Sequence, residues 1–171
     1  TKVRQFETLK GGFWYTPSMR FLYIASVWPE LSSSAAGLRS WGLIQALQSR
    51  GEVIVASPSG ETKWKDRLKK SDFEVFSIQP NSSSFDEWIK HLRPDLVLFD
   101  RFIMEEQFGW RVAQAVPKAL RVLDTQDLHF LRKARADALA RGWSLKQVQA
   151  LNGNFLRTST CMRELACLLY T

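Results

Sequence analysis

Residues 94–100 read PDLVLFD, and this stretch decides the fold of the chain. Four consecutive apolar residues stand between two carboxylates, and such a short continuous run is typical of a strand buried on both faces of a parallel sheet. Working outward, we predict four more strands from apolar runs of similar length. They cover residues 21–27, 53–56, 73–78 and 119–124, and the last of them also ends on a carboxylate, Asp124.

Segments with helical periodicity separate these strands. Leu38, Trp41, Ile44 and Leu47 recur every three residues, and Gly51 is expected to stop the helix that carries them. The other predicted helices are a basic one that begins near Thr62, one capped by Ser84, one over residues 105–116 that ends before Pro117, one over residues 127–141, and a last one from about Phe155. Strands that alternate with helices predict an α/β fold, a Rossmann-like parallel sheet with helices on both faces.

The composition fits one domain and argues against several classes of protein. Of the 171 residues, 45% are hydrophobic, which is enough to bury a core. The formal net charge of +7 would allow contacts with phosphates, nucleic acid or an anionic membrane. However, the basic clusters at residues 63–70 and 132–135 are not interleaved with aromatic residues on one predicted surface, so nucleic-acid binding is disfavoured. Cys161 and Cys167 have the spacing of neither a redox pair nor a zinc half-site, and no metal is expected.

The sequence predicts one domain behind a short irregular segment. Residues 1–18 show no clear periodicity, and the domain is expected to cover residues 19–171. No apolar run reaches the roughly 18 residues of a membrane span, and no signal-peptide pattern is present, so we expect a cytoplasmic protein, with peripheral membrane attachment as an alternative. An apolar stripe of Met162, Leu165, Ala166 and Leu169 continues almost to Thr171, which predicts a domain truncated within a helix.

The carboxyl ends of the strands indicate where a ligand would bind, because open parallel sheets bind ligands at that edge. The segment after the first strand, residues 28–37, has neither a dinucleotide-binding glycine pattern nor a P-loop. Ser34 and Gly37 instead supply a hydroxyl and a glycine at a helix N-terminus, where backbone N–H groups could face an anionic or hydroxyl-rich ligand. The alternative is a long solvated connection.

Two further strand ends carry candidate site residues. Asp100 could orient a ligand hydroxyl next to Arg101, or it could cap the following helix. Asp124 and Asp127 are two carboxylates on one loop, which is weak support for a magnesium site. His129 follows them and is the candidate catalytic residue, as a base or as a partner of a sugar hydroxyl, with a surface histidine as the alternative.

Several motifs in order resemble one enzyme family. They are MRFLYIAS at residues 19–26, a serine-rich loop that ends in AGLR at 36–39, LQSRGEVIV at 47–55, PDLVLFD at 94–100 and LDTQDLH at 123–129. Together they are similar to the N-terminal half of GT-B glycosyltransferases of the glycogen-synthase-like, group 1 type. The resemblance covers residues 19–166, and each motif alone is loose.

The resemblance implies two Rossmann-like domains with an active site between them. The N-terminal domain would handle a hydroxyl acceptor, and the C-terminal domain would bind a nucleotide sugar as co-substrate, without a further cofactor. Gly37 and its loop would then lie near the donor phosphates and the acceptor, and His129 near the sugar. The candidate substrate-binding residues from the strand ends are Ser34, Gly37, Asp100, Arg101, Asp124 and Asp127. The donor-binding half of that family has no counterpart in residues 1–171, so this chain alone is predicted to be inactive. A stand-alone Rossmann-like binding or regulatory fragment without catalysis is the alternative.

Overall fold

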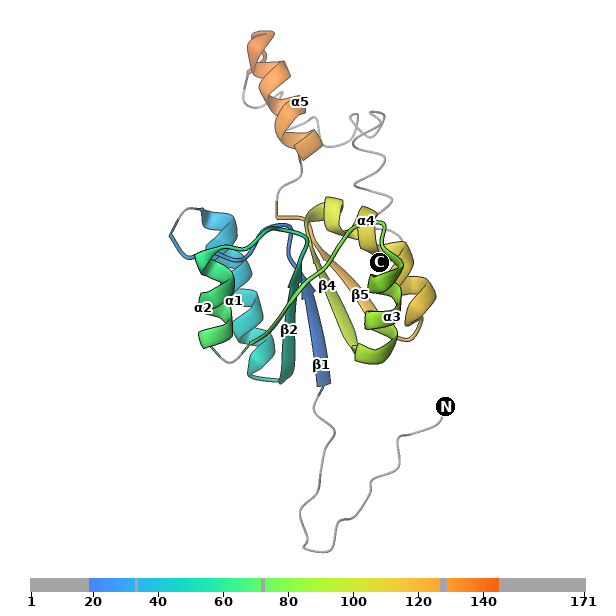
Figure 1. Ribbon diagram of the computed structural model, residues 1–171. Coiled ribbons are helices and arrows are strands. Elements are labelled where there is room, and N and C mark those ends of the chain that lie inside the picture. Colours follow the sequence, from blue (N-terminus) through green and yellow to red (C-terminus); the bar gives the residue numbers. More distant parts are fainter. Residues whose placement is uncertain (1–18, 33, 72, 127–128, 145–171) are drawn as a thin grey trace, which may run out of the picture.

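A computed structural model describes residues 19–144 of the chain, apart from residues 33, 72, 127 and 128. Its centre is a five-stranded sheet in which every pairing is parallel and the strand order is β3-β2-β1-β4-β5 (Figure 1). The strands are β1 (Met19–Ile24), β2 (Gly51–Ser57), β3 (Glu74–Ser77), β4 (Leu96–Asp100) and β5 (Leu120–Asp124). The helices are α1 (Ala35–Gln48), α2 (Lys63–Lys70), α3 (Ser83–Leu92), α4 (Arg101–Ala115) and α5 (His129–Ala140).

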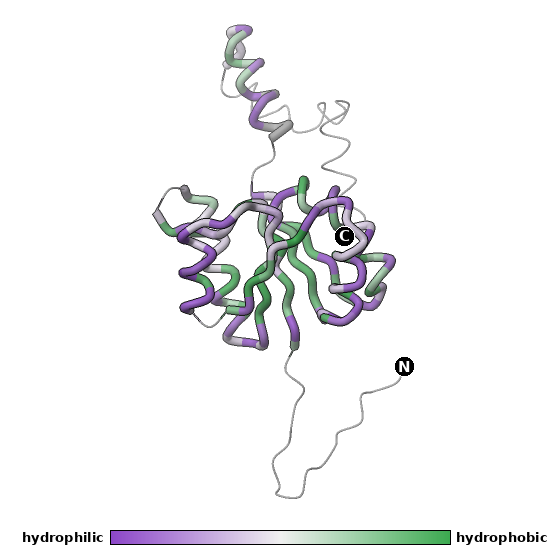
Figure 2. The backbone as a smooth tube through the Cα atoms, in the orientation of Figure 1, coloured by the Kyte–Doolittle hydropathy of each residue, from purple (hydrophilic) through white to green (hydrophobic). Residues whose placement is uncertain are grey.

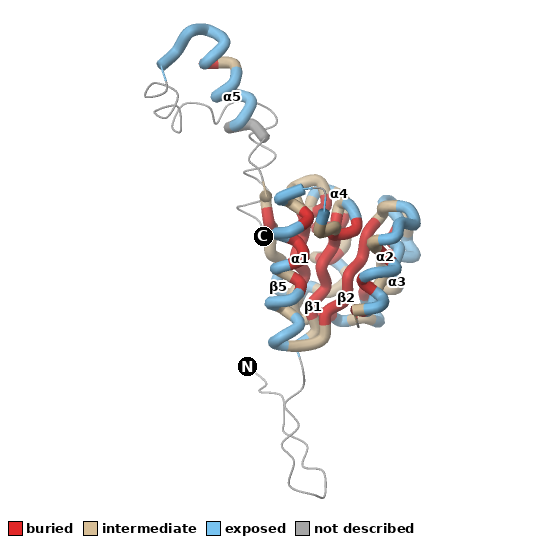
Figure 3. The backbone as a smooth tube through the Cα atoms, turned by 90° about the vertical axis from the view of Figure 1, so that its left-hand side faces the viewer, coloured by how far each residue is buried: buried red, intermediate tan, exposed pale blue. Residues whose placement is uncertain are grey.

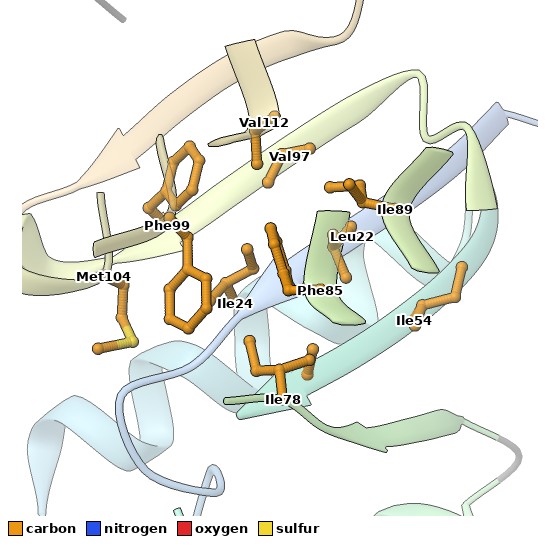
Figure 4. Close-up of a cluster of buried hydrophobic side chains, with 12 residues drawn as sticks. Leu22, Ile24, Ile54, Ile78, Phe85, Ile89, Val97, Phe99, Met104 and Val112 are labelled. Atoms are coloured by element: carbon orange, nitrogen blue, oxygen red, sulfur yellow. The ribbon is translucent and has the colours of Figure 1, made fainter. Parts of the chain in front are cut away.

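Helices cover both faces of the sheet, which explains why the strands are continuously apolar. Phe21 and Tyr23 of β1 pack in one hydrophobic cluster with residues of α1 and α2. Leu22 and Ile24 point to the other face and pack with residues of α3 and α4 (Figure 4). The hydrophobic tube segments therefore coincide with the strands in Figure 2, and the same strands are buried in Figure 3. The predicted α/β Rossmann-like fold is confirmed.

Three predicted helix boundaries are wrong, each for a local reason. Gly51 does not stop α1, which ends at Gln48 with Ser49 as its C-cap; Gly51 is the first residue of β2. The glycine is needed there because a Cβ atom would lie 2.1 Å from the carbonyl oxygen of Met19 on the neighbouring strand. Ser82, and not Ser84, caps α3. The fourth helix begins at Arg101, directly after β4 and earlier than predicted.

The buried side of α1 also differs from the predicted stripe. Trp41 and Ile44 are buried as expected, but 55% of Leu38 is exposed. The helix instead turns Gly37 and Ser40 inward with Trp41 and Ile44. Gly37 faces Glu30 in the loop after β1 and Ser40 contacts Tyr23 of β1, so the start of the helix packs against this loop and this strand.

The basic cluster at residues 63–70 does meet aromatic side chains, contrary to the prediction. The guanidinium of Arg67 lies 6.0 Å from the ring centroid of Trp41 and 5.5 Å from that of Trp64. Lys63 stands over Trp64 at 5.3 Å. Trp41 belongs to α1, which is distant from α2 in the sequence. In the fold, α1 and α2 lie side by side on one face of the sheet (Figure 1). The cations thus lie over these indole faces.

Some predictions fall outside the described residues. They concern the segment 1–18, the helix from about Phe155, both cysteines, the apolar stripe 162–169 and Asp127. Within the described part of the chain, no helix is long and apolar enough to cross a membrane.

Candidate functional site

The candidate site lies where the direction of strand addition reverses. From β1 the chain adds β2 and β3 on one side, whereas β4 and β5 lie on the other side. The connecting helices accordingly change faces between the two halves. At such a switch point, the loops that leave neighbouring strands diverge and ligands bind outside the carboxyl ends. Residues just after β1 and at the ends of β4 and β5 occupy this position.

Asp100, the last residue of β4, links the loops on both sides of the switch point. Only 2% of its surface is exposed. Its Oδ2 accepts hydrogen bonds from the backbone N–H of Ser26 at 3.0 Å and from the Ser26 hydroxyl at 2.6 Å. Its Oδ1 accepts a hydrogen bond from the side-chain amide of Gln126. Asp100 occupies the N-cap position of α4 but makes no side-chain capping bond. Its carboxylate therefore bonds Ser26 and Gln126 and does not cap the helix.

Gln126 extends this network into the core. Its Nε2 also donates to the Ser40 hydroxyl at 3.0 Å, and Tyr23 donates its phenolic O–H to the same Ser40 oxygen at 2.8 Å. Burial raises the pKa of Tyr23 far above its ordinary value, and the nearby charge of Asp100 adds to this, so the phenol keeps its proton and acts as a donor. The Oε1 of Gln126 is buried and has no hydrogen-bond partner among the described residues.

Asp124, the last residue of β5, is held by α1. It is the register partner of Asp100, so the two carboxylates stand side by side at the sheet edge. Arg39 binds it in a two-pronged ion pair, with Nε 2.9 Å from Oδ2 and NH2 2.9 Å from Oδ1. These bonds raise the pKa of Arg39. The Arg39 side chain remains 58% exposed, whereas that of Asp124 is 7% exposed, so the guanidinium forms the surface and the carboxylate lies beneath it.

Backbone strain gathers at the same edge. Arg101, which follows Asp100, has φ 69°, and Gln126, two residues after Asp124, has φ 52°. Left-handed backbone in residues other than glycine costs on the order of 1–3 kcal/mol and clusters at functional sites. Two further such residues, Asn81 and Arg93, occupy a turn and the C-cap of α3, where this conformation is usual. At Gln126 the backbone N–H donates to Oδ1 of Asp124 at 3.3 Å, so this conformation is tied to the carboxylate at the end of β5, whereas Arg101 has no such turn or cap.

In the first predicted segment, residues 28–37, Ser34 and Gly37 have structural roles at the start of α1. The Ser34 side chain caps α1 by accepting a hydrogen bond from the Gly37 N–H at 3.1 Å. Gly37 is buried, and a Cβ atom on it would lie 2.0 Å from the carbonyl oxygen of Glu30. The glycine therefore lets the loop after β1 pack against α1, close to the switch point.

Contacts of Trp28 also hold the loop after β1 in place. Trp28 is 2% exposed, and its Nε1–H donates to the carbonyl oxygen of Gly60 at 2.7 Å. The ammonium group of Lys65 lies 5.3 Å from the Trp28 ring centroid, donates to the Ser77 hydroxyl at 2.7 Å and pairs with Glu61. The loop after β1 is thus tied to the ends of β2 and β3.

The Glu61–Lys65 pair should make stability sensitive to acid. The hydrogen bond from Lys65 is the main cause of the lowered pKa of Glu61. A carboxyl whose pKa is lower in the folded state stabilises the fold above its unfolded pKa of about 4.3, and this stabilisation is lost as the pH falls through the folded value. We expect Glu61→Gln to flatten the fall in unfolding free energy over that pH range, measured by urea denaturation from neutral to acidic pH. An unchanged slope would show that the pair does not contribute.

The structure brings most predicted residues together and adds five that were missed. Asp100, Arg101 and Asp124 meet at the switch point, with Ser34 and Gly37 on the adjacent start of α1. His129 is the first residue of α5, and neither its side chain nor Asp127 belongs to the described part. The added residues are Tyr23, Ser26, Arg39, Ser40 and Gln126. Of these, Ser26 lies near the end of the predicted strand 21–27 and Gln126 lies two residues after the predicted strand 119–124, and this position at a strand end was the one available signal.

The described side chains of this edge are hydroxyl, amide, carboxylate and guanidinium groups, which can exchange hydrogen bonds with the hydroxyl groups of a ligand. Among the described residues, no group of three or more His, Cys, Asp or Glu side chains could hold a metal ion. Comparisons of the chain with protein-family models, with curated proteins and with solved structures give no match.

Proposed function

We propose that this chain forms the acceptor-side domain of a nucleotide-sugar-dependent glycosyltransferase that transfers a sugar to a hydroxyl acceptor. One observation carries the proposal. Asp100 and Asp124 stand in register at the switch point of a Rossmann-like sheet and are fixed by Ser26, Gln126 and Arg39. Hydroxyl, amide, carboxylate and guanidinium groups together supply the donors and acceptors that can bind the hydroxyl groups of a ligand.

The proposed roles follow from exposure. Asp100 and Asp124 are buried and already accept hydrogen bonds, so they act as positioning residues that hold the edge rigid. Arg39 and Arg101 have side chains that are 58% and 35% exposed, and these would contact the acceptor. The proposal assigns the nucleotide sugar, as co-substrate, to a second domain, and residues 1–171 alone would then transfer no sugar because the leaving diphosphate lacks stabilisation.

A second candidate is a binding module without catalysis. The observation in its favour is that both buried carboxylates are already held by hydrogen bonds within the domain, Asp100 by Ser26 and Gln126 and Asp124 by Arg39. Both candidates bind a hydroxyl-rich ligand at the switch point. They differ in whether a donor-binding domain then transfers a sugar to that ligand.

Acceptor binding is tested with uncharged methyl glycosides and disaccharides on the purified chain. We expect saturable binding, and Arg101→Ala should weaken it about tenfold, the effect of one lost hydrogen bond to a charged group. Arg50→Ala is the matched control, because Arg50 is exposed at the opposite edge and bonds only its own helix end, through the carbonyl oxygen of Ala46. Equal losses in both variants, or no binding at all, would contradict the proposal. Sugar transfer by the chain alone would contradict the assignment of the donor to another domain.

A further inference from the structure

A pocket at the outer edge of the sheet is separate from the switch point. It has a volume of about 380 Å³ and lies between the end of β3 and the first turns of α3. Its lining residues are Phe76, Ser77, Ile78, Gln79, Ser84, Phe85 and Trp88. This volume falls in the range of small-molecule sites. None of the residues that were predicted from the sequence to bind a ligand lines it. We call it the β3–α3 pocket.

Aromatic rings run from the surface of this pocket into the core. The ring centroids of Phe76 and Trp88 are 5.2 Å apart, and those of Trp88 and Phe85 are 5.8 Å apart. Phe85 in turn packs on Phe108 of α4 at 4.8 Å. Phe76 is 37% exposed, whereas Phe85 is 2% exposed and belongs, with Ile78, to the cluster shown in Figure 4. The exposed ring of Phe76 and the half-buried ring of Trp88 are therefore packed on buried side chains and form one apolar surface.

No charged side chain lines the pocket, although the net charge of the chain is +7. None of its seven lining residues is ionisable. Its polar groups are the hydroxyls of Ser77 and Ser84 and the amide of Gln79. The Ser77 hydroxyl accepts a hydrogen bond from the ammonium group of Lys65, whose charge is offset by its ion pair with Glu61. Hydroxyl and amide groups both donate and accept hydrogen bonds. An uncharged ligand with its own hydroxyls matches this lining, and an anionic one does not.

We propose that the β3–α3 pocket binds an uncharged saccharide ring. Phe76 and Trp88 touch each other at a tilt of 50°, so no flat aromatic ring fits between them. A saturated ring can pack its C–H face on the exposed side of one aromatic ring while its hydroxyls reach the serines and Gln79. That this saccharide is part of the acceptor rests on the proposed function. Because β3 lies three strands from β4, at about 4.8 Å per strand, the pocket and the Asp100–Arg101 end of β4 are about 14 Å apart across the sheet. An acceptor of more than one sugar ring spans that separation.

The test measures binding of uncharged methyl glycosides and disaccharides by saturation-transfer NMR and titration. Trp88→Ala should weaken binding at least tenfold. The matched control is Trp110→Ala, since Trp110 is 48% exposed on α4, lies under the guanidinium of Arg111 at 4.4 Å and does not line the pocket. Unchanged affinity in Trp88→Ala, or the same loss in both variants, would overturn the proposal.

A second variant distinguishes loss of the binding site from loss of core packing, which Trp88→Ala could also cause. Ser84 is exposed in the first turn of α3 and lines the pocket, so Ser84→Trp should fill the cavity and abolish binding while leaving Trp88 in place. Glycoside binding that survives Ser84→Trp but falls in Arg101→Ala would leave the proposed function standing and overturn the pocket. Loss in Ser84→Trp, even without any sugar transfer, would support the pocket. The unaltered chain could instead bind no glycoside and dimerise with rising concentration. If Ser84→Trp abolished that dimerisation, the pocket would be a protein interface and the proposal would be overturned.

Discussion

Asp100→Ala is expected to lower the free energy of unfolding by about 3 kcal/mol. The substitution removes a carboxylate that is 2% exposed and accepts three hydrogen bonds, from the backbone N–H and the hydroxyl of Ser26 and from the side-chain amide of Gln126. Each buried unsatisfied donor costs about 1–3 kcal/mol, and bonds to a charged acceptor lie at the upper end. Urea denaturation followed by circular dichroism measures the change.

The control for this variant is a carboxylate in an exposed ion pair. Asp137 lies 3.6 Å from Lys133, and its side chain is 48% exposed, so Asp137→Ala should change stability by less than about 1 kcal/mol. Asp100→Asn preserves the shape of the side chain and should fall between the two. If Asp100→Ala were no more destabilising than Asp137→Ala, the carboxylate would not hold the switch point together.

Gly37→Ala and Gly42→Ala should change stability in opposite directions although both lie in α1. A Cβ at Gly37 would lie 2.0 Å from the carbonyl oxygen of Glu30, which is backbone and cannot rotate away. Such overpacking costs about 1–3 kcal/mol and would push the loop after β1 out of place. A Cβ at Gly42 meets nothing within 4 Å, so alanine there should stabilise the helix by about 0.5–1 kcal/mol.

Thermal and urea unfolding of the two glycine variants check this prediction. Gly37→Ala should also weaken the glycoside binding proposed above, because Glu30 belongs to the loop that leaves β1. A stable Gly37→Ala with unchanged binding would mean that the close packing of the loop on α1 is not needed.

The sheet could be predicted from the sequence because each of its strands is a short apolar run bounded by polar or turn residues. The continuous pattern of Leu96 to Phe99 reflects burial on both faces, which the two hydrophobic clusters show. The boundaries were harder to predict. Gly51 is typical of a helix stop, but its close approach to Met19 depends on a strand pairing that the local sequence does not contain.

The carboxylates of the site were predictable, and most of their partners were not. Asp100 and Asp124 end predicted strands, so parallel pairing alone brings them to one edge. The bonds to Ser40 and Arg39 require α1 to pack with those residues facing the sheet edge, and the apolar stripe through Leu38 predicted a different face. The β3–α3 pocket was missed because its rings come from a strand and a helix whose packing sets their separation.

The most direct test of the central claim maps ligand contacts residue by residue. The isotope-labelled chain is titrated with uncharged methyl glycosides and disaccharides, and backbone amide shifts are followed by NMR. Binding beyond the carboxyl ends of β1, β4 and β5 predicts shifts at Ser26, Arg101 and Gln126, with none at Arg50 and Leu120 on the opposite edge. Shifts confined to the opposite edge, or no shifts with any of these saccharides, would contradict an acceptor site at the switch point.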